Sequence, residues 1–274
     1  MTRKKKRVLG FGLRLLLGLC FVTPLLIGFA FSFLPNEILD GIPTAGDFLE
    51  YFTLENYQWV FGHIPVLRYV TNSLVMCVVI IVAQVIISSL AAYAFSFFKF
   101  KGKDFLFQLI LIAMMIPGQV VTIANFLTIQ GADLLNSYIG LCLPYMIGGT
   151  AIFMMRQYYL TIPKELKEAS MIDGCSDMRF LFQIAVPLSV PTIAALGIYL
   201  FIDVYNMYLW PLLVGQNQNM FTVQIGMSML VNSDATQYGR ILAGAMISIA
   251  IPVITFFIGQ DYLIKGMTSG SVKG

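Results

Sequence analysis

Six long apolar runs, separated by shorter polar segments, dominate the pattern of hydrophobic and polar positions along the chain. The runs cover residues 11–34, 72–98, 105–129, 137–159, 191–214 and 241–264. About 20 predominantly apolar residues make a helix that crosses the hydrocarbon core of a bilayer, whereas a spanning β-barrel alternates over segments of about ten residues. The pattern therefore predicts an all-α polytopic membrane protein with six transmembrane helices, and residues 1–274 are expected to form one transmembrane domain.

The low content of charged residues supports a membrane location. Only 11% of the 274 residues are charged and 58% are hydrophobic, while a soluble domain has about 25% charged residues. At less than half that share, the chain cannot cover a surface that faces water. The bilayer is therefore expected to be its solvent.

The positions of the basic residues predict the orientation. With the N-terminus placed in the cytoplasm, only Arg68 and Arg240 of the 17 lysines and arginines fall outside. Lys and Arg are enriched in the cytoplasmic loops of membrane proteins, and the bias here alternates correctly at every loop. Both termini are therefore expected in the cytoplasm.

The first apolar run follows a basic N-terminus, as the apolar part of a signal peptide does. The run is about 24 residues long, against about 7–15 for a signal peptide, and no small-residue cleavage site follows it. We interpret it as a retained first span.

A cytoplasmic loop over about residues 160–190 carries the clearest local signal. Pro163 suits the first turn of a helix, and the acidic Glu165 suits its positive N-terminus. Apolar residues recur at helical spacing from Leu166 onward, and Gly174 supplies a stop. The segment predicts a short amphipathic helix over about residues 164–173, which either docks on another protein or lies flat on the membrane.

The same loop contains an ordered motif that resembles a known family. The motif consists of Glu168, Ala169, Ser170, Asp173, Gly174, Ile184 and Pro187. Its spacing resembles the Glu-Ala-Ala loop of the permease subunits of binding-protein-dependent ABC importers, in which Gly, Ile and Pro follow Glu-Ala-Ala at fixed distances. Ser170 stands in place of the second Ala, and Val186 in place of the Leu before Pro187.

The resemblance extends over nearly the whole chain and points to the carbohydrate-uptake branch of these importers. Similar segments occur at residues 72–74, 91–95, 160–163, 206–213 and 266–274. They look like those of maltose permeases and also like those of glycerol-3-phosphate importer permeases. Tyr205 departs from the pattern, because the branch usually has Trp before Asn206.

The resemblance implies the type I permease fold of ABC importers and a division of labour among chains. The helix over residues 164–173 would dock on a homodimeric ATPase subunit that holds ATP and Mg. A second permease subunit would complete the translocation path, and an extracellular solute-binding protein would deliver a sugar or related polyol. The residues expected to couple to the ATPase are Glu165, Glu168, Ala169, Ser170, Asp173 and Gly174. The chain would then be a multi-pass permease surrounded by the lipid of a bacterial plasma membrane.

Polar residues within the spans are expected to line the solute path. A carboxylate at the centre of a span costs about 2.5–3.5 kcal/mol on insertion scales, so Asp203 is expected to face protein or water. An interhelical hydrogen bond that fixes the bundle is an equal alternative for this residue. The other candidates are Tyr199 and Asn206 on the same predicted helix, and Gln119 and Asn125 after a predicted break at Pro117–Gly118.

Catalytic and metal sites find no support in the sequence. His63 is the single histidine, the four cysteines lack metal-ligand spacing, and no Gly-rich phosphate loop is present, so ATP is expected on another chain. Orientation and anionic lipid explain the basic N-terminus without nucleic acid. Glycerol 3-phosphate or a glycerophosphodiester is the alternative solute. A membrane-embedded lipid-modifying enzyme is the alternative from another class, but it requires clustered ionisable residues, which Asp203 alone does not supply.

Overall fold

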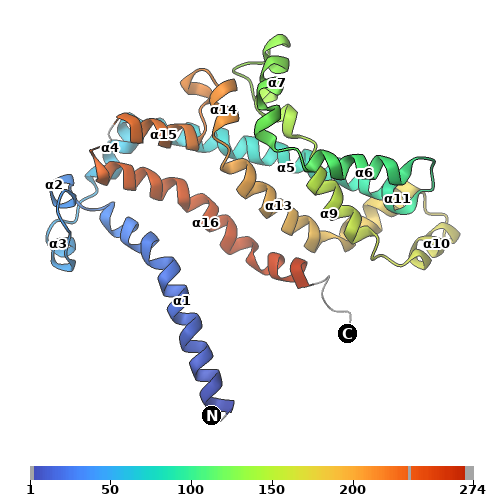
Figure 1. The fold of residues 1–274 in the computed structure, drawn as a ribbon, viewed down its shortest axis with the longest axis horizontal. Coiled ribbons are helices and arrows are strands. Elements are labelled where there is room, and N and C mark those ends of the chain that lie inside the picture. The colour runs from blue at the N-terminus through green and yellow to red at the C-terminus, as the bar shows by residue number, and fades with distance from the viewer. Residues whose placement is uncertain (1–2, 234–235, 269–274) are drawn as a thin grey trace. The chain divides into compact units, whose positions relative to one another are not determined.

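The computed structural model describes residues 3–233 and 236–268, and the regular structure of this part of the chain is entirely helical. Three helices in it are long and apolar enough to cross a membrane alone (Figure 1). They are α1 (Arg3–Phe31), α5 (Val66–Phe97) and α16 (Tyr238–Thr268). The all-α class predicted from the apolar runs is confirmed.

Three further crossings each require a bent pair of helices. In the first pair, α6 (Lys103–Met114) and α7 (Gly118–Gly131) meet at a bend of 97°. In the second, α8 (Tyr138–Cys142) with η1 (Leu143–Tyr145) meets α9 (Gly149–Tyr159) at a bend of 49°. In the third, α11 (Asp177–Phe180), η2 (Leu181–Ala185) and α12 (Val186–Leu188) together meet α13 (Val190–Tyr205) at a bend of 74°. The extended Pro117 caps α7, so the predicted break at this position is confirmed. Six spans result only if each pair crosses as one, and that count stays a prediction.

The fifth apolar run is divided differently from the expected continuous span over residues 191–214. The helix ends at Tyr205, and a turn separates it from α14 (Leu209–Val214). The reason is Pro211, whose ring would clash in a continuous helix with the carbonyl of Met207, four residues earlier. Pro191 bears the same relation to Pro187 and accounts for the break between α12 and α13.

The chain divides into two compact units, and the single transmembrane domain expected from the sequence stays a prediction. Unit 1 comprises Met1–Leu67 and Gly226–Ile251, and unit 2 comprises Arg68–Ile225 and Pro252–Gly274. Both α5 and α16 contribute residues to each unit, so the division falls within continuous helices.

Unit 1 contains α1, three short helices and parts of α15 and α16. The short helices are α2 (Asn36–Leu39), α3 (Ala45–Glu50) and α4 (Glu55–His63), and α15 covers Val223–Ser233. A small core of Val60, Leu230 and Ala243 holds α4, α15 and α16 together. The buried Asn56 amide donates to the carbonyls of Ser32 at 3.0 Å and Leu34 at 2.8 Å, which fixes the chain after α1.

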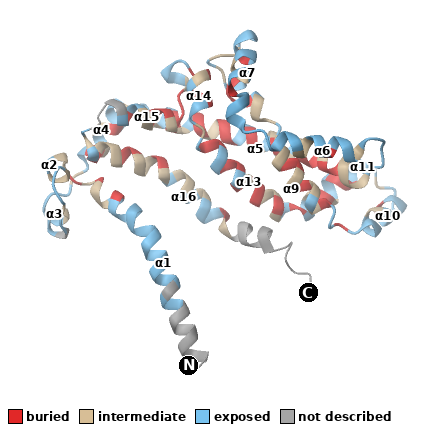
Figure 2. Cartoon of the chain, viewed as in Figure 1, coloured by how far each residue is buried: buried red, intermediate tan, exposed pale blue. Residues whose placement is uncertain are grey.

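Unit 2 has the larger core, built mainly on α5, α9 and α13, where Figure 2 shows buried residues gathering. The cluster consists of Ala92, Tyr93, Ala151, Met155, Tyr159, Ile162, Phe180, Leu181, Ala185, Leu196 and Leu200. It therefore joins the end of α5 to α11 and η2 as well as to α9 and α13. The short helix α10 (Lys164–Ile172) follows this core along the chain.

Candidate functional site

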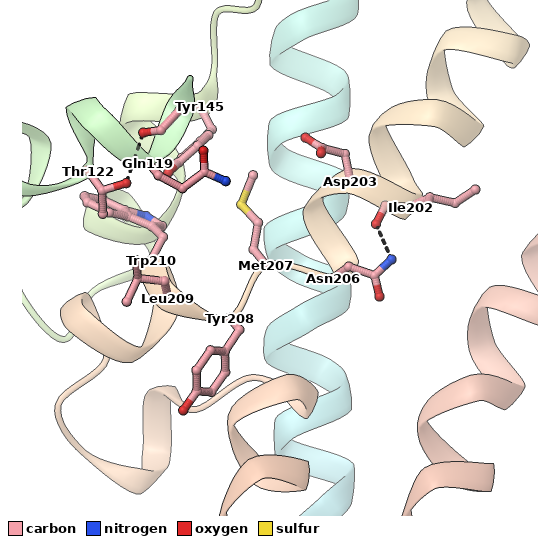
Figure 3. Close-up of a pocket in the computed structure, with 11 residues that line it drawn as sticks. Gln119, Thr122, Tyr145, Ile202, Asp203, Asn206, Met207, Tyr208, Leu209 and Trp210 are labelled. Carbon is pink, nitrogen blue, oxygen red and sulfur yellow. Dashed lines mark hydrogen bonds between the residues drawn. The ribbon is translucent and has the colours of Figure 1, made fainter. Parts of the chain in front are cut away.

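A cavity of about 630 Å³ lies in unit 2, where three helices are interrupted (Figure 3). Its lining comes from the first turns of α7, from η1, and from the end of α13 with the turn into α14. The lining residues are Gly118, Gln119, Thr122, Tyr145, Ile202, Asp203, Asn206, Met207, Tyr208, Leu209 and Trp210. Prolines 117 and 211 interrupt regular helix on two sides, and helix breaks that line a cavity are typical of solute sites in transporters.

Among the described residues that line the cavity, Asp203 is the only one with a charged side chain. Within the part of the chain that the structure describes, its carboxylate makes neither a hydrogen bond nor an ion pair, and the interhelical bond that the sequence offers as an alternative is not seen among these residues. Asn206, one turn later, donates its amide to the carbonyl of Ile202 at 2.8 Å, as Figure 3 shows. The Asp203 carboxylate is thus available to a solute.

Aromatic side chains form the wall that faces these polar groups. The rings of Tyr145 and Trp210 meet edge to face, with centroids 5.6 Å apart. The Trp210 indole N–H donates to the carbonyl of Leu141 at 2.9 Å, and the Gln84 amide donates to the carbonyl of Tyr145 at 2.8 Å. Because a buried hydrogen bond holds Trp210 and a partly buried one holds Tyr145, the wall is pre-formed. Such a wall can stack against the apolar face of a sugar ring.

The residues predicted for the solute path separate into two groups. Asp203, Asn206 and Gln119 line the cavity, whereas Tyr199 and Asn125 do not. Tyr199 is 47% exposed, one turn before Asp203 on α13, and Asn125 lies further along α7. The prediction did not include Tyr145, although Pro144 within η1 and the pair Gly148–Gly149 after it are the kind of signal that marks a helix break.

The predicted cytoplasmic helix is present as α10, and its end is set by glycine. Pro163 precedes the helix, Asp173 follows it, and Gly174 adopts the left-handed conformation, with φ of 74°. The Gly174 N–H donates to the carbonyl of Met171 at 3.0 Å, and that of Cys175 donates to Ser170 at 2.9 Å. These bonds satisfy carbonyls that the last turn leaves free.

The residues predicted to couple to an ATPase do not all share one environment. Glu165, Glu168, Ala169, Asp173 and Gly174 are exposed. Ser170 is buried, and its hydroxyl donates to the carbonyl of Lys167 at 2.7 Å, so it faces its own chain instead of a partner. Ile172, which the prediction did not include, is 87% exposed. The free surface of α10 therefore combines carboxylates with large apolar side chains.

Comparison with known proteins gives consistent matches. The profile of the family described as "Binding-protein-dependent transport system inner membrane component" matches residues 84–269. The arabinooligosaccharides transport system permease protein AraQ of Halalkalibacterium halodurans is 35% identical over 282 residues, covering 100% of both chains. The sn-glycerol-3-phosphate transport system permease protein UgpE of Pectobacterium atrosepticum is 37% identical over 198 residues, covering 72% of this chain and 70% of the relative.

A solved structure has the same fold. It is a chain from a bacterial ABC transporter involved in the import of the acidic polysaccharide alginate, with a TM-score of 0.79 and 21% sequence identity. The match covers 96% of this chain and 99% of that one.

Proposed function

Because this chain belongs to the family of binding-protein-dependent transport system inner membrane components, we propose that it forms the translocation path for a neutral sugar or related polyol. As a member of that family it is a multi-pass permease of a bacterial membrane and a transport component. We further propose that a second permease subunit completes the path, that a binding protein delivers the solute, and that a homodimeric ATPase holding ATP and Mg drives it.

The single observation that carries the choice of solute is the charge of the cavity. The part of its lining that the structure describes includes one carboxylate, Asp203, and no Lys, Arg or His. The N-terminus of α7, at Gly118, contributes only about half a positive charge. A phosphate ester would thus find no cationic side chain to pair with among the described lining residues. A neutral solute with many hydroxyls finds hydrogen-bonding groups from Gln119, Asp203 and Asn206 and a ring-stacking wall.

Uptake by cells tests this choice. A strain without the chain and the same strain complemented with it would be given radiolabelled arabino-oligosaccharide, the solute class named for one relative. We expect uptake only in the complemented strain, and we expect unlabelled oligosaccharide, but not glycerol 3-phosphate, to compete. Chain-dependent uptake of glycerol 3-phosphate without saccharide uptake would show that the alternative solute is the right one.

Asp203→Asn is expected to raise the KM for saccharide uptake about tenfold while the complex still assembles. Hydrogen bonds to charged groups contribute about 1.5–3 kcal/mol and neutral ones about 0.5–1.5 kcal/mol, and a difference of about 1.4 kcal/mol is tenfold. Tyr199→Phe is the matched control, because Tyr199 lies on the same helix outside the cavity lining and should leave KM unchanged. A collapse in yield with an unchanged KM for the residual uptake would make Asp203 a structural residue instead.

The proposed orientation places both termini and α10 in the cytoplasm. It is supported by the bias of the basic residues, and it predicts opposite labelling of two exposed positions, Gln216 and Lys101. In intact cells, with the native cysteines replaced, a membrane-impermeant thiol reagent should label Gln216→Cys and leave Lys101→Cys unlabelled until the membrane is broken. The reverse labelling would invert the topology.

The docking surface for the ATPase is proposed to be the exposed side of α10. A nine-residue helix with Glu168, Met171 and Ile172 exposed has too few contacts to be an independent unit. Its mixture of carboxylates and apolar side chains suits a protein groove better than the anionic surface of the cytoplasmic leaflet, which attracts basic segments. This favours docking on a protein over the flat membrane position.

A further inference from the structure

Lys167 is much less exposed to solvent than the other charged residues of α10. The side chains of Lys164, Glu165 and Glu168 are exposed, whereas that of Lys167 is only 14% exposed. Lys is among the residues that proteins almost never bury without a partner. Its placement against its own chain therefore requires specific contacts.

The Lys167 ammonium lies in an aromatic cage at the C-terminal end of α5. Its Nζ atom is 5.1 Å from the ring centroid of Tyr93, 5.3 Å from that of Phe97 and 5.1 Å from that of Phe98. A cation within about 6 Å of an aromatic face is attracted by the ring quadrupole, more strongly where water is excluded. Tyr93 and Phe97 pack in turn on Phe180, with centroids 6.2 Å and 5.6 Å away, which anchors the cage in the core of unit 2.

Asp177, at the start of α11, completes the site. Its Oδ1 atom lies 2.9 Å from Lys167 Nζ and accepts a hydrogen bond from the Tyr93 hydroxyl at 2.8 Å. The hydrogen bond from Lys167, and after it the one from Tyr93, holds the pKa of Asp177 below its ordinary value. The carboxylate therefore stays ionised at neutral pH. As a result, α5, α10 and α11 are joined through one oxygen atom.

The same helix α5 leads from this joint to the wall of the cavity. Gln84, earlier on α5, donates its amide to the carbonyl of Tyr145 at 2.8 Å, and Tyr145 lines the cavity. Gln84 is buried, and Gly148 packs so closely against its amide that a Cβ at Gly148 would fit only if the amide moved. Close-packed contacts of this kind transmit displacements instead of absorbing them. A shift of α5 is therefore passed to Tyr145.

We propose that Lys167 is a positioning residue that ties the movement of α10 to α5 and, through Gln84, to the Tyr145 wall of the cavity. The inference rests on the proposed function, because a joint between α10 and the solute path matters only if an ATPase moves α10. Lys167 contacts neither solute nor nucleotide in this role. It determines how much of the movement of α10 reaches the cavity.

The test uses the whole complex, with its partner subunits and binding protein, in proteoliposomes. Both ATP hydrolysis and labelled saccharide uptake are measured, and their ratio gives the solute moved per ATP. Lys167→Met keeps an apolar stem in the cage but removes the charge, and Lys167→Arg keeps the charge. Lys101→Met is the matched control, because Lys101 is an exposed lysine outside α10.

Lys167→Met is expected to lower the solute moved per ATP by about fivefold while hydrolysis continues, within the range of about 2- to 30-fold over which mutations alter coupling between sites. Lys167→Arg should restore the ratio, and Lys101→Met should not change it. Wild-type complex that hydrolyses ATP without uptake would contradict the proposed function itself. Wild-type uptake together with an unchanged ratio in Lys167→Met would overturn only the role of Lys167.

Tyr93→Phe tests the proposed role of Lys167 if the Lys167→Met complex does not assemble. This variant removes one hydroxyl, and with it the hydrogen bond to Asp177, but leaves the ring that packs on Phe180. We expect a smaller fall in solute per ATP, about twofold, at the lower end of the same range. A ratio equal to that of the wild type would overturn the proposal.

Discussion

Gly174→Leu is expected to abolish both solute uptake and the stimulation of the partner ATPase by the loaded binding protein. Gly174 has a φ of 74°, and an added Cβ would meet no atom within 4 Å. A side chain at this position is therefore unfavourable only because of the backbone conformation, since the left-handed conformation costs a branched residue about 1–2 kcal/mol. In a helix of only nine residues, this is enough to unravel the last turn, which carries Met171 and Ile172.

The matched variant for this test is Gly174→Asn. Asn adopts the left-handed conformation far more readily than Leu and ends helices in the same way. It should retain most uptake, although the two side chains differ little in size. Both variants should insert normally, because residue 174 lies outside the predicted spans. Lost uptake with fully stimulated hydrolysis in Gly174→Leu would mean that α10 does not carry the ATPase signal.

Gly140→Ala is expected to sharply reduce the amount of folded complex. Gly140 lies in α8, and a methyl group there would overlap the backbone carbonyl of Leu134 and lie 3.1 Å from a methyl carbon of Ile129. A backbone carbonyl cannot rotate away as a flexible side chain does. The Ser137 hydroxyl fixes the same turn, donating to Leu134 at 2.6 Å and accepting from the Gly140 N–H at 3.0 Å.

The expected loss from Gly140→Ala is about 1–3 kcal/mol of folding free energy, as for an overpacked core. The thermal midpoint of the purified complex and its yield would measure it. Gly131→Ala is the matched control, because Gly131 lies in α7 and an added Cβ meets nothing within 4 Å. There the change should be neutral or slightly stabilising, since Ala favours helix. Equal thermal midpoints for the two variant complexes would show that the turn before α8 accommodates the added methyl group at little energetic cost.

The features that the sequence predicts well are those with a local cause. The stop at Gly174 follows from the preference of glycine for the left-handed conformation, and the break before α7 follows from Pro117. Hydropathy placed the fifth span less well, because it registers apolar character and not backbone geometry. The rings of Pro191 and Pro211 would each clash with a backbone carbonyl in a continuous helix. The long helix of this run therefore covers Val190–Tyr205.

The parts of the site that the sequence could not supply depend on contacts between distant segments. Tyr145 and Trp210 form one wall because η1 packs against α14, and the sequence does not show that these two segments meet. Lys167 belongs to an amphipathic helix and would be assigned to its solvent face. Only the packing of α5 against α11 places three rings and a carboxylate around its ammonium.

Solute accumulation in sealed proteoliposomes tests the central claim most directly. The complex would be reconstituted with ATP on the side of α10 and with loaded binding protein on the opposite side. We expect labelled neutral arabino-oligosaccharide to accumulate above its external concentration with ATP, and not with a non-hydrolysable analogue, while labelled glycerol 3-phosphate does not accumulate. Equilibration at the same rate with and without ATP, or accumulation of glycerol 3-phosphate in place of the saccharide, would contradict this account.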